Sequence, residues 1–391
     1  MKYDFDAPVV RRGTGCYKWD CDEMATDVIP MWVADMDFRV AQPIIDALHR
    51  RVEHGVFGYE KVPDAYYDAV IDWFSRRHGW KIEREWIQYT TGVVPASSAV
   101  IKALTGKGDK VLVQTPVYNC FFSSIKNNGC EVLRAPLRFT GSTYEVDFSE
   151  FERIVSEEKP RLFLMCNPHN PVGRVWSADE LLRMGEICLR YGVTVVSDEI
   201  HCELVMPGHK FTPFASLSAE MQSNCITLNS PSKSFNIAGL QCANIICNNS
   251  EIRAKIDRAL NDNEVCDVNP LGVEAVIAAY NQSEDWIDGL NVYLWDNYRC
   301  LRRFFAQNMP QLAVCELEGT YLVWVNIGST GLSADELTHR LLSEGRVLVN
   351  SGMMYSNGAS EGRDFIRLNI ACPRSQMMEG LERISRVMQS L

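Results

Sequence analysis

Short apolar segments alternate with amphipathic segments between residues 90 and 250. Several of the apolar segments carry hydrophobic side chains on consecutive positions, which is typical of strands covered on both faces. Six segments have this character: 111–115, 131–137, 161–166, 193–197, 225–228 and 243–247. Because strands and helices alternate over this length, the pattern predicts an α/β fold with a mostly parallel sheet between layers of helices.

The clearest helix signal lies between the third and fourth of these segments. Ser177 and Glu180 have the spacing of a capping box, in which each residue satisfies a backbone N–H of the other. Apolar residues then recur at helical spacing until Gly192, where the helix is expected to end: Leu181, Met184, Ile187, Cys188 and Tyr191.

The carboxyl-terminal part has a different pattern. It predicts a long helical stretch over 272–307, interrupted near 281–285, and then strands and helices at 321–326, 334–344, 347–350, 365–370 and from 375 onward. The first 40 residues are rich in Asp, Pro and Gly and are expected to form an extended arm. We therefore predict three regions: 1–45 as an arm belonging to a small domain, 46–285 as a large domain, and 286–391 as the rest of the small domain.

Composition and charge exclude several classes of protein. With 46% hydrophobic and 23% charged residues, the 391-residue chain has the composition of a folded globular protein and not of a disordered one. Its formal charge of -11 repels phosphate backbones and anionic lipids, so neither nucleic acid nor a membrane is an expected partner.

The cysteines and the amino terminus indicate a compartment. The sequence has 14 cysteines, its first residues lack the apolar core of a secretory signal, and no apolar run reaches the roughly 18 residues of a membrane helix. Thiols in such a chain are typical of a reducing compartment, so we expect a cytoplasmic protein. No Cys-x-x-Cys pair is present, and we expect buried thiols and no metal site.

Polar and aromatic residues follow four of the predicted strands. In an α/β sheet, ligands bind beyond the carboxyl ends of the strands, where these residues would lie. The four are Tyr118 after the first strand, Asn170 within a turn-rich segment, Asp198 after a fully apolar strand, and Lys233 among serines. A fifth segment, 91–95, precedes a helix and could offer backbone N–H groups to an anion.

Taken singly these residues have ordinary structural explanations, but together they suit one group of cofactors. An aldehyde cofactor needs an amine to form a Schiff base, which a lysine supplies. A pyridine nitrogen withdraws electrons only while protonated, and an adjacent buried carboxylate keeps it so. The ring needs an aromatic neighbour, its phenolic oxygen a hydrogen-bond donor, and its phosphate hydroxyls and helix N-terminal amides.

The motifs around these residues resemble a known family. Asn167-Pro168-x-Asn170-Pro171-x-Gly173, Ser197-Asp198-Glu199 and Ser230-x-Ser232-Lys233 are similar to the motifs of fold-type-I, pyridoxal-phosphate-dependent aminotransferase-like enzymes. Further segments, at 31–38, 91–95, 168–176, 198–201, 232–240 and 371–374, resemble the MalY/PatB branch of cystalysin-like C–S lyases and cystathionine β-lyases. The resemblance covers nearly the whole chain.

The resemblance implies pyridoxal 5′-phosphate as cofactor and a role for each matching residue. Lys233 would carry the cofactor and move the substrate α-proton, Asp198 would pair with the ring nitrogen, and Tyr118 would stack on the ring. Asn170 would donate to the phenolic oxygen, and Arg367 would bind the substrate carboxylate. The remaining cofactor residues implied are Gly92, Val93, Val94, Ser230, Ser232, His201 and Tyr59, and Ala34, Asn170 and Tyr355 are further substrate residues.

Two positions depart from the aspartate aminotransferase pattern. His201 replaces a tyrosine that donates to the phenolic oxygen, and Gln241 replaces a phosphate-binding arginine. Similar substitutions occur in the lyase branch, so they favour a lyase.

The resemblance implies α,β-elimination on S-substituted cysteines or cystathionine, giving a thiol or homocysteine, pyruvate and ammonia. Two alternatives remain open: an amino acid aminotransferase, and a lyase that also binds a transcription regulator. Tyr59 matches a tyrosine that reaches the phosphate of a neighbouring subunit, which implies a homodimer. The sequence does not identify the sulfur amino acid.

Overall fold

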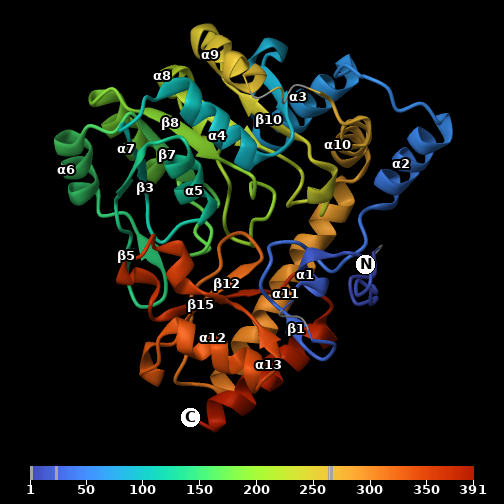
Figure 1. Ribbon diagram of the computed structural model, residues 1–391, viewed down its shortest axis with the longest axis vertical. Helices are drawn as coiled ribbons and strands as arrows, with labels where there is room; N and C mark the ends of the chain where they lie inside the picture. The colour runs from blue at the N-terminus through green and yellow to red at the C-terminus, as the bar shows by residue number, and fades with distance from the viewer. Residues whose placement is uncertain (1–2, 23–24, 263, 265–266) are drawn as a thin grey trace.

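The computed structural model describes residues 3–22, 25–262, 264 and 267–391. A seven-stranded sheet forms the centre of its larger part (Figure 1). In spatial order the strands are β2 (Ile87–Thr90), β10 (Ala243–Ile246), β9 (Cys225–Asn229), β8 (Thr194–Asp198), β7 (Leu162–Cys166), β3 (Lys110–Val113) and β4 (Glu131–Arg134). The helices of this part are α2 (Gln42–His54), α3 (Asp64–His78), α4 (Val93–Leu104), α5 (Cys120–Asn127), α6 (Phe148–Glu158), α7 (Ala178–Arg190), α8 (Ala219–Ser223), α9 (Ser250–Asn261) and α10 (Pro270–Gln282).

The predicted α/β fold with a mostly parallel sheet is confirmed, with one reversal. The five strands from β9 to β4 are parallel, whereas β10 runs antiparallel to both β9 and β2. No α-helix separates β9 from β10, so the chain returns beside β9 without the helical crossover that usually joins parallel strands. The pattern of apolar residues in the sequence does not show that β10 runs antiparallel to its neighbours.

Both faces of the sheet are buried, as the consecutive apolar residues predict. Leu112, Phe163 and Val195 point to the core beneath α6 and α7, whereas Leu164 and Val196 point to the core beneath α4, α5 and α9. All five residues of β7 are buried. Covering the sheet on both faces leaves its carboxyl edge as the place where polar side chains meet.

The capping box at the start of α7 is present. The Ser177 hydroxyl accepts from the Glu180 N–H at 3.2 Å, and the Glu180 carboxylate accepts from the Ser177 N–H at 2.8 Å. The predicted apolar stripe is buried up to Cys188, but Tyr191 is 39% exposed because it caps the helix after the last buried turn.

The smaller part combines the chain's two ends (Figure 1). Its antiparallel sheet has the order β11 (Ala313–Val314), β12 (Leu322–Asn326), β15 (Phe365–Asn369) and β14 (Asn350–Ser351). The amino-terminal segment contributes α1 (Tyr17–Asp20) and β1 (Ile29–Pro30), and β1 pairs in parallel with β13 (Val347–Leu348). Its remaining helices are α11 (Glu284–Asn308), α12 (Ala334–Ser343) and α13 (Arg374–Gln389).

Helix α11 links the two parts and runs from the end of α10 toward the small sheet (Figure 1). The predicted domain boundary at 285/286 falls in its first turn. The division into 1–45, 46–285 and 286–391 stays a prediction. No helix within the described ranges is both long enough and apolar enough to cross a bilayer.

Candidate active site

A cavity of about 290 Å³ lies at the carboxyl ends of β3, β7, β8 and β9, beneath the small sheet. Tyr118 follows β3, Asn170 follows β7, Asp198 ends β8 and Lys233 follows β9, so parallel strands bring four distant sequence positions together. Arg367 enters from β15. The predicted site residues that line this cavity are Ala34, Gly92, Val93, Val94, Tyr118, Asn170, Asp198, His201, Ser232, Lys233, Tyr355 and Arg367.

Two predicted residues lie outside this lining. The buried Ser230 hydroxyl donates to the Cys242 carbonyl at 2.7 Å and accepts from the Ser232 N–H at 3.0 Å, so it shapes the turn that presents Ser232. Tyr59 is 96% exposed on the segment between α2 and α3, which leaves it free to reach another molecule.

The structure also adds lining residues that the sequence did not single out. They are Val33, Pro95, Asn119, Cys166, Ile200 and Asn350. Most adjoin a predicted residue in the sequence, and Val33, Pro95 and Ile200 also lie within the motif segments 31–38, 91–95 and 198–201. Asn350 instead reaches the site through sheet pairing, because it lies opposite Arg367 in the β14–β15 ladder.

Lys233 is a half-buried lysine whose amine points to the arm. Its Nζ donates to the Ala34 carbonyl oxygen at 2.8 Å. Burial lowers the pKa of Lys233, and the Arg367 guanidinium acts in the same direction, while Asp35 and Asp198 oppose it. A lowered pKa increases the share of the neutral amine, which is the nucleophilic form.

Asp198 is a buried carboxyl group at the end of β8. Burial raises the pKa of Asp198 to about 7. Two groups act in the opposite direction: the Ile200 N–H, which donates to the carboxylate at 3.1 Å, and the Lys233 ammonium. A cation in the cavity would favour the ionised carboxylate, so Asp198 suits a protonated ring nitrogen.

The protein holds Arg367 through its two terminal nitrogens. Its Nη1 donates to Asn170 Oδ1 at 3.0 Å and its Nη2 to the Trp32 carbonyl at 2.7 Å. Its Nε is buried and has no hydrogen-bond partner within the described part of the chain. A guanidinium with unused donors is the usual partner of a carboxylate.

The substituted position 201 holds a buried neutral imidazole. Burial, aided by the Lys233 and Arg367 charges, lowers the pKa of His201 to about 3. Its Nδ1 has no hydrogen-bond partner among the residues described. Gln241 is exposed, with a positive φ of 50°, and does not line the cavity.

The chain matches the model of the family described as aminotransferase class I and II over residues 26–384. It belongs to this family. It is 42% identical to cystathionine beta-lyase PatB of Bacillus subtilis over 97% of this chain and 98% of that one, and 34% identical to protein MalY of Escherichia coli over 97% of each. It also superposes on cystalysin from Treponema denticola with a TM-score of 0.95, 33% identity and complete coverage of both chains. The predicted resemblance is confirmed.

The cystalysin structure contains pyridoxal 5′-phosphate, and the residues of this family member fit that group. The amine of Lys233 and the acid of Asp198 share the cavity with two buried nitrogen atoms, Arg367 Nε and His201 Nδ1, that have no hydrogen-bond partner among the described residues. At its other end the cavity meets the start of α4, where Gly92 is the N-cap and the N–H groups of the first turn have no acceptor within the helix. A phosphate is favoured at such a terminus.

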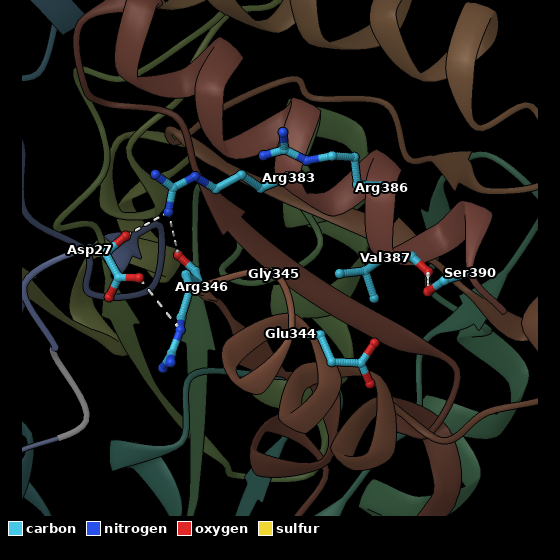
Figure 2. A pocket seen from close by; sticks show the side chains of 8 residues that line it. All are labelled: Asp27, Glu344, Gly345, Arg346, Arg383, Arg386, Val387 and Ser390. Atoms are coloured by element: carbon cyan, nitrogen blue, oxygen red, sulfur yellow. Dashed lines mark hydrogen bonds and ion pairs between the residues drawn. The ribbon is translucent and has the colours of Figure 1, made fainter.

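A second hollow, of about 440 Å³, lies beside α13 in this aminotransferase-family fold (Figure 2). Arg383 donates there to the carbonyls of Asp27 and Arg346, and Arg346 faces the Asp27 carboxylate (Figure 2). These arginines are engaged with the protein itself. None of the residues that line this hollow follows a strand of the seven-stranded sheet, and none of them is a lysine. The hollow therefore does not suit an aldehyde cofactor.

One group of potential metal ligands is already engaged. His78, Cys202 and Glu203 lie close together next to α3. Glu203 Oε1 accepts from the Trp73 indole at 2.7 Å and faces His78 Nε2 at 2.7 Å, while Arg77 faces its other oxygen at 3.7 Å. A carboxylate compensated in this way ties the turn after Asp198 to α3, and we assign it a structural role.

Proposed function

We propose that the protein catalyses α,β-elimination on S-substituted cysteines or cystathionine, releasing a thiol or homocysteine, pyruvate and ammonia. The cofactor is pyridoxal 5′-phosphate. The convergence of Lys233, Asp198 and Arg367 in one cavity carries this proposal, because it joins an amine, a buried acid and a carboxylate-binding guanidinium.

Pyridoxal 5′-phosphate supplies an electron sink when bound, which makes the substrate Cα–H bond acidic. Lys233 would hold the cofactor through Nζ and, as a free amine, would take the proton from the substrate Cα. Its lowered pKa favours both steps because each requires the unprotonated amine. Asp198 would keep the ring nitrogen of the cofactor protonated, and its burial would prevent water from competing for that proton.

Arg367 orients the substrate through the α-carboxylate. Since Asn170 and the Trp32 carbonyl hold its two terminal nitrogens, the guanidinium plane is set before substrate arrives. Tyr118 would cover the cofactor ring, and Ala34, Asn350 and Tyr355 would border the space left for the sulfur side chain.

The phosphate and the phenolic oxygen have separate partners. We assign the phosphate to the Gly92–Val94 backbone and the Ser232 turn, with Ser230 supporting that turn. We assign the phenolic oxygen to the Asn170 amide, with the neutral His201 imidazole as a second possible donor. Gln241 brings no positive charge, so helix amides carry more of the phosphate binding.

Elimination is favoured over transamination by the named relatives. PatB of Bacillus subtilis is a cystathionine beta-lyase, and it is 42% identical to this chain over nearly the full length of both. Both reactions use Lys233, Asp198 and Arg367 as far as removal of the α-proton. They differ after that step, because elimination breaks the substrate Cβ–S bond and transamination leaves it intact.

We also propose a homodimer, supported by the surface around Tyr59. Val52, Val56 and Phe57 are large exposed apolar side chains close to Tyr59 in the sequence. A second copy of the chain would bury them and could bring Tyr59 to the phosphate end of the neighbouring cavity. The cytoplasmic location expected from the cysteines stays a prediction.

The test is a panel of cystathionine and S-alkyl-L-cysteines, assayed for pyruvate and for released thiol. We expect the two products in equal amounts, and their loss together with the visible absorbance of the bound cofactor in Lys233→Ala. Lys255→Ala, which changes an exposed lysine on α9, is the control. Accumulation of pyridoxamine phosphate and a sulfur-containing keto acid, with little pyruvate, would identify an aminotransferase instead.

A further inference from the structure

Two backbone carbonyls of the amino-terminal arm contact the proposed reaction centre. The Trp32 carbonyl accepts from Arg367 Nη2 at 2.7 Å. The Ala34 carbonyl accepts from Lys233 Nζ at 2.8 Å and from the Tyr321 hydroxyl at 2.9 Å. The position of this short segment therefore affects both the carboxylate-binding arginine and the reactive amine.

Four charged side chains hold the segment from its outer side, and we call them the arm clamp: Arg11, Lys18, Asp35 and Asp37. Lys18 Nζ lies 2.9 Å from Asp37 Oδ2 and 3.5 Å from Asp35 Oδ1. Arg11 donates to both carboxylates at 2.6 Å. The two cations and two anions balance each other, so the clamp is neutral as a unit.

The centre of the clamp is shielded from water. Lys18 is 1% exposed and Asp37 is 2% exposed. Asp37 also accepts from the Trp19 indole at 2.8 Å and from the Gln376 amide at 2.9 Å. Removing Lys18 would leave a buried carboxylate with part of its compensation gone, which is a costly state.

The chain before the clamp is folded to present its cations. The Asp20 carboxylate accepts from the backbone N–H groups of Gly13, Thr14, Gly15 and Cys16 at 2.9–3.1 Å. This turn brings Arg11 and Lys18 to the same side of the arm. Residues 11–20 thus fold around the Asp20 carboxylate, which does not line the cavity.

The inner side of the segment is hydrogen-bonded to the strand that carries Arg367 and to the turn that carries Lys233. The Asn369 amide donates to the carbonyls of Val33 and Asp35, two residues after Arg367 on β15. The Asn236 amide donates to the carbonyls of Met36 and Phe38, three residues after Lys233. The Trp32 carbonyl contacts Arg367 directly, whereas Asn236 also holds the segment near Lys233, so loss of Lys18 should act more on Arg367 than on Lys233.

We propose that Lys18 is a positioning residue: through Asp37 and Asp35 it holds the Trp32 carbonyl against Arg367 and so sets the guanidinium for the substrate carboxylate. Lys18 itself touches neither substrate nor cofactor. The inference rests on the proposed function only for the role of Arg367. It predicts that loss of Lys18 weakens binding of the carboxylate more than binding of the amine.

The test compares two ligands that lack a leaving group, L-alanine and its decarboxylated counterpart ethylamine. Each is titrated into holoenzyme, and its dissociation constant is read from the change in cofactor absorbance. In Lys18→Met we expect the constant for alanine to rise about tenfold and that for ethylamine to change by less than about twofold. Lys18→Arg, which retains the charge, should restore most of the alanine affinity, and Lys255→Met is the exposed control.

An equal loss of affinity for both ligands, or no loss, would overturn the proposal, since general damage to the fold does not distinguish a carboxylate. If Lys18→Met does not fold, Arg11→Gln at the partly exposed edge of the clamp provides the same comparison. Because neither ligand is eliminated, failure of the lyase assay and failure of this test are separate results.

Discussion

Arg367 on β15 and Asn170 after β7 are joined by a hydrogen bond of 3.0 Å from Nη1 to Oδ1. The bond links the small sheet to the carboxyl edge of the large one. It also determines which half of the Asn170 amide faces the guanidinium, so Nδ2 is the group available to donate to the phenolic oxygen of the cofactor. The residue proposed to bind the substrate and the residue proposed to bind the cofactor therefore position each other.

Arg367→Lys should raise KM for S-alkyl-L-cysteines and lower kcat/KM by roughly 100-fold, because lysine keeps the charge but loses the planar fork. Asn170→Ala should have a smaller effect on KM, since the Trp32 carbonyl still holds Nη2. Steady-state pyruvate formation measures both. An unchanged KM in Arg367→Lys would remove this residue from carboxylate binding.

Glu199 should make the cofactor-free protein less stable as the pH rises. Burial raises its pKa to about 8 from 4.5, so between these values the folded protein binds the proton more tightly than the unfolded chain. The free energy of unfolding then falls with rising pH through this window and levels off above it. Asp198, with a pKa raised to about 7, adds a slope of the same sign between pH 4 and 7.

In Glu199→Gln the free energy of unfolding should therefore fall less as the pH rises from 4.5 to 8. The difference from the wild-type fall should be on the order of 5 kcal/mol, which corresponds to the pKa shift. Urea unfolding of the cofactor-free protein at a series of pH values provides the measurement. Glu186→Gln, on the exposed side of α7, is the matched control. A slope that survives in Glu199→Gln would show that this carboxyl group is not its source.

Gly352→Ala should both destabilise the protein and weaken substrate binding. A Cβ at this position would lie 2.2 Å from the Gly362 carbonyl oxygen and 2.5 Å from that of Phe365, both backbone atoms. The turn that would have to move carries Tyr355 into the cavity. We expect a loss of roughly 2 kcal/mol and a raised KM, whereas Gly106→Ala, where the added Cβ meets no atom closer than 3.8 Å, should cost little.

Mixed dimers test whether Tyr59 is shared between subunits. Lys233→Ala and Tyr59→Ala subunits are each expected to give inactive homodimers when cofactor is scarce. Random mixing makes half of the dimers hybrids, and each hybrid has one intact site if Tyr59 acts across the interface. Activity should then recover to about a quarter of the wild-type value. No recovery would place Tyr59 in the same subunit as the site it serves, whereas an active Tyr59→Ala homodimer would place it outside the site.

Much of the site could be predicted from sequence because the sheet imposes a simple rule. Residues that follow parallel strands meet at one edge, so Tyr118, Asn170, Asp198 and Lys233 could be grouped without coordinates. Arg367 came from the resemblance alone, because β15 belongs to another sheet. Glu199 could be named only as part of a motif, because sequence does not show that its carboxyl group is buried.

The sequence by itself determined the α/β layers, the capping box of α7 and the family, since these depend on local periodicity and short motifs. Only the tertiary structure decided that β10 runs antiparallel, that Ser230 supports the turn from behind the cavity, and that the arm clamp holds residues 32–37 over Lys233 and Arg367. Each of these depends on contacts between residues far apart in the chain. Lys18 and Asp37 show why: both charges are stable in the interior only because folding places them 2.9 Å apart.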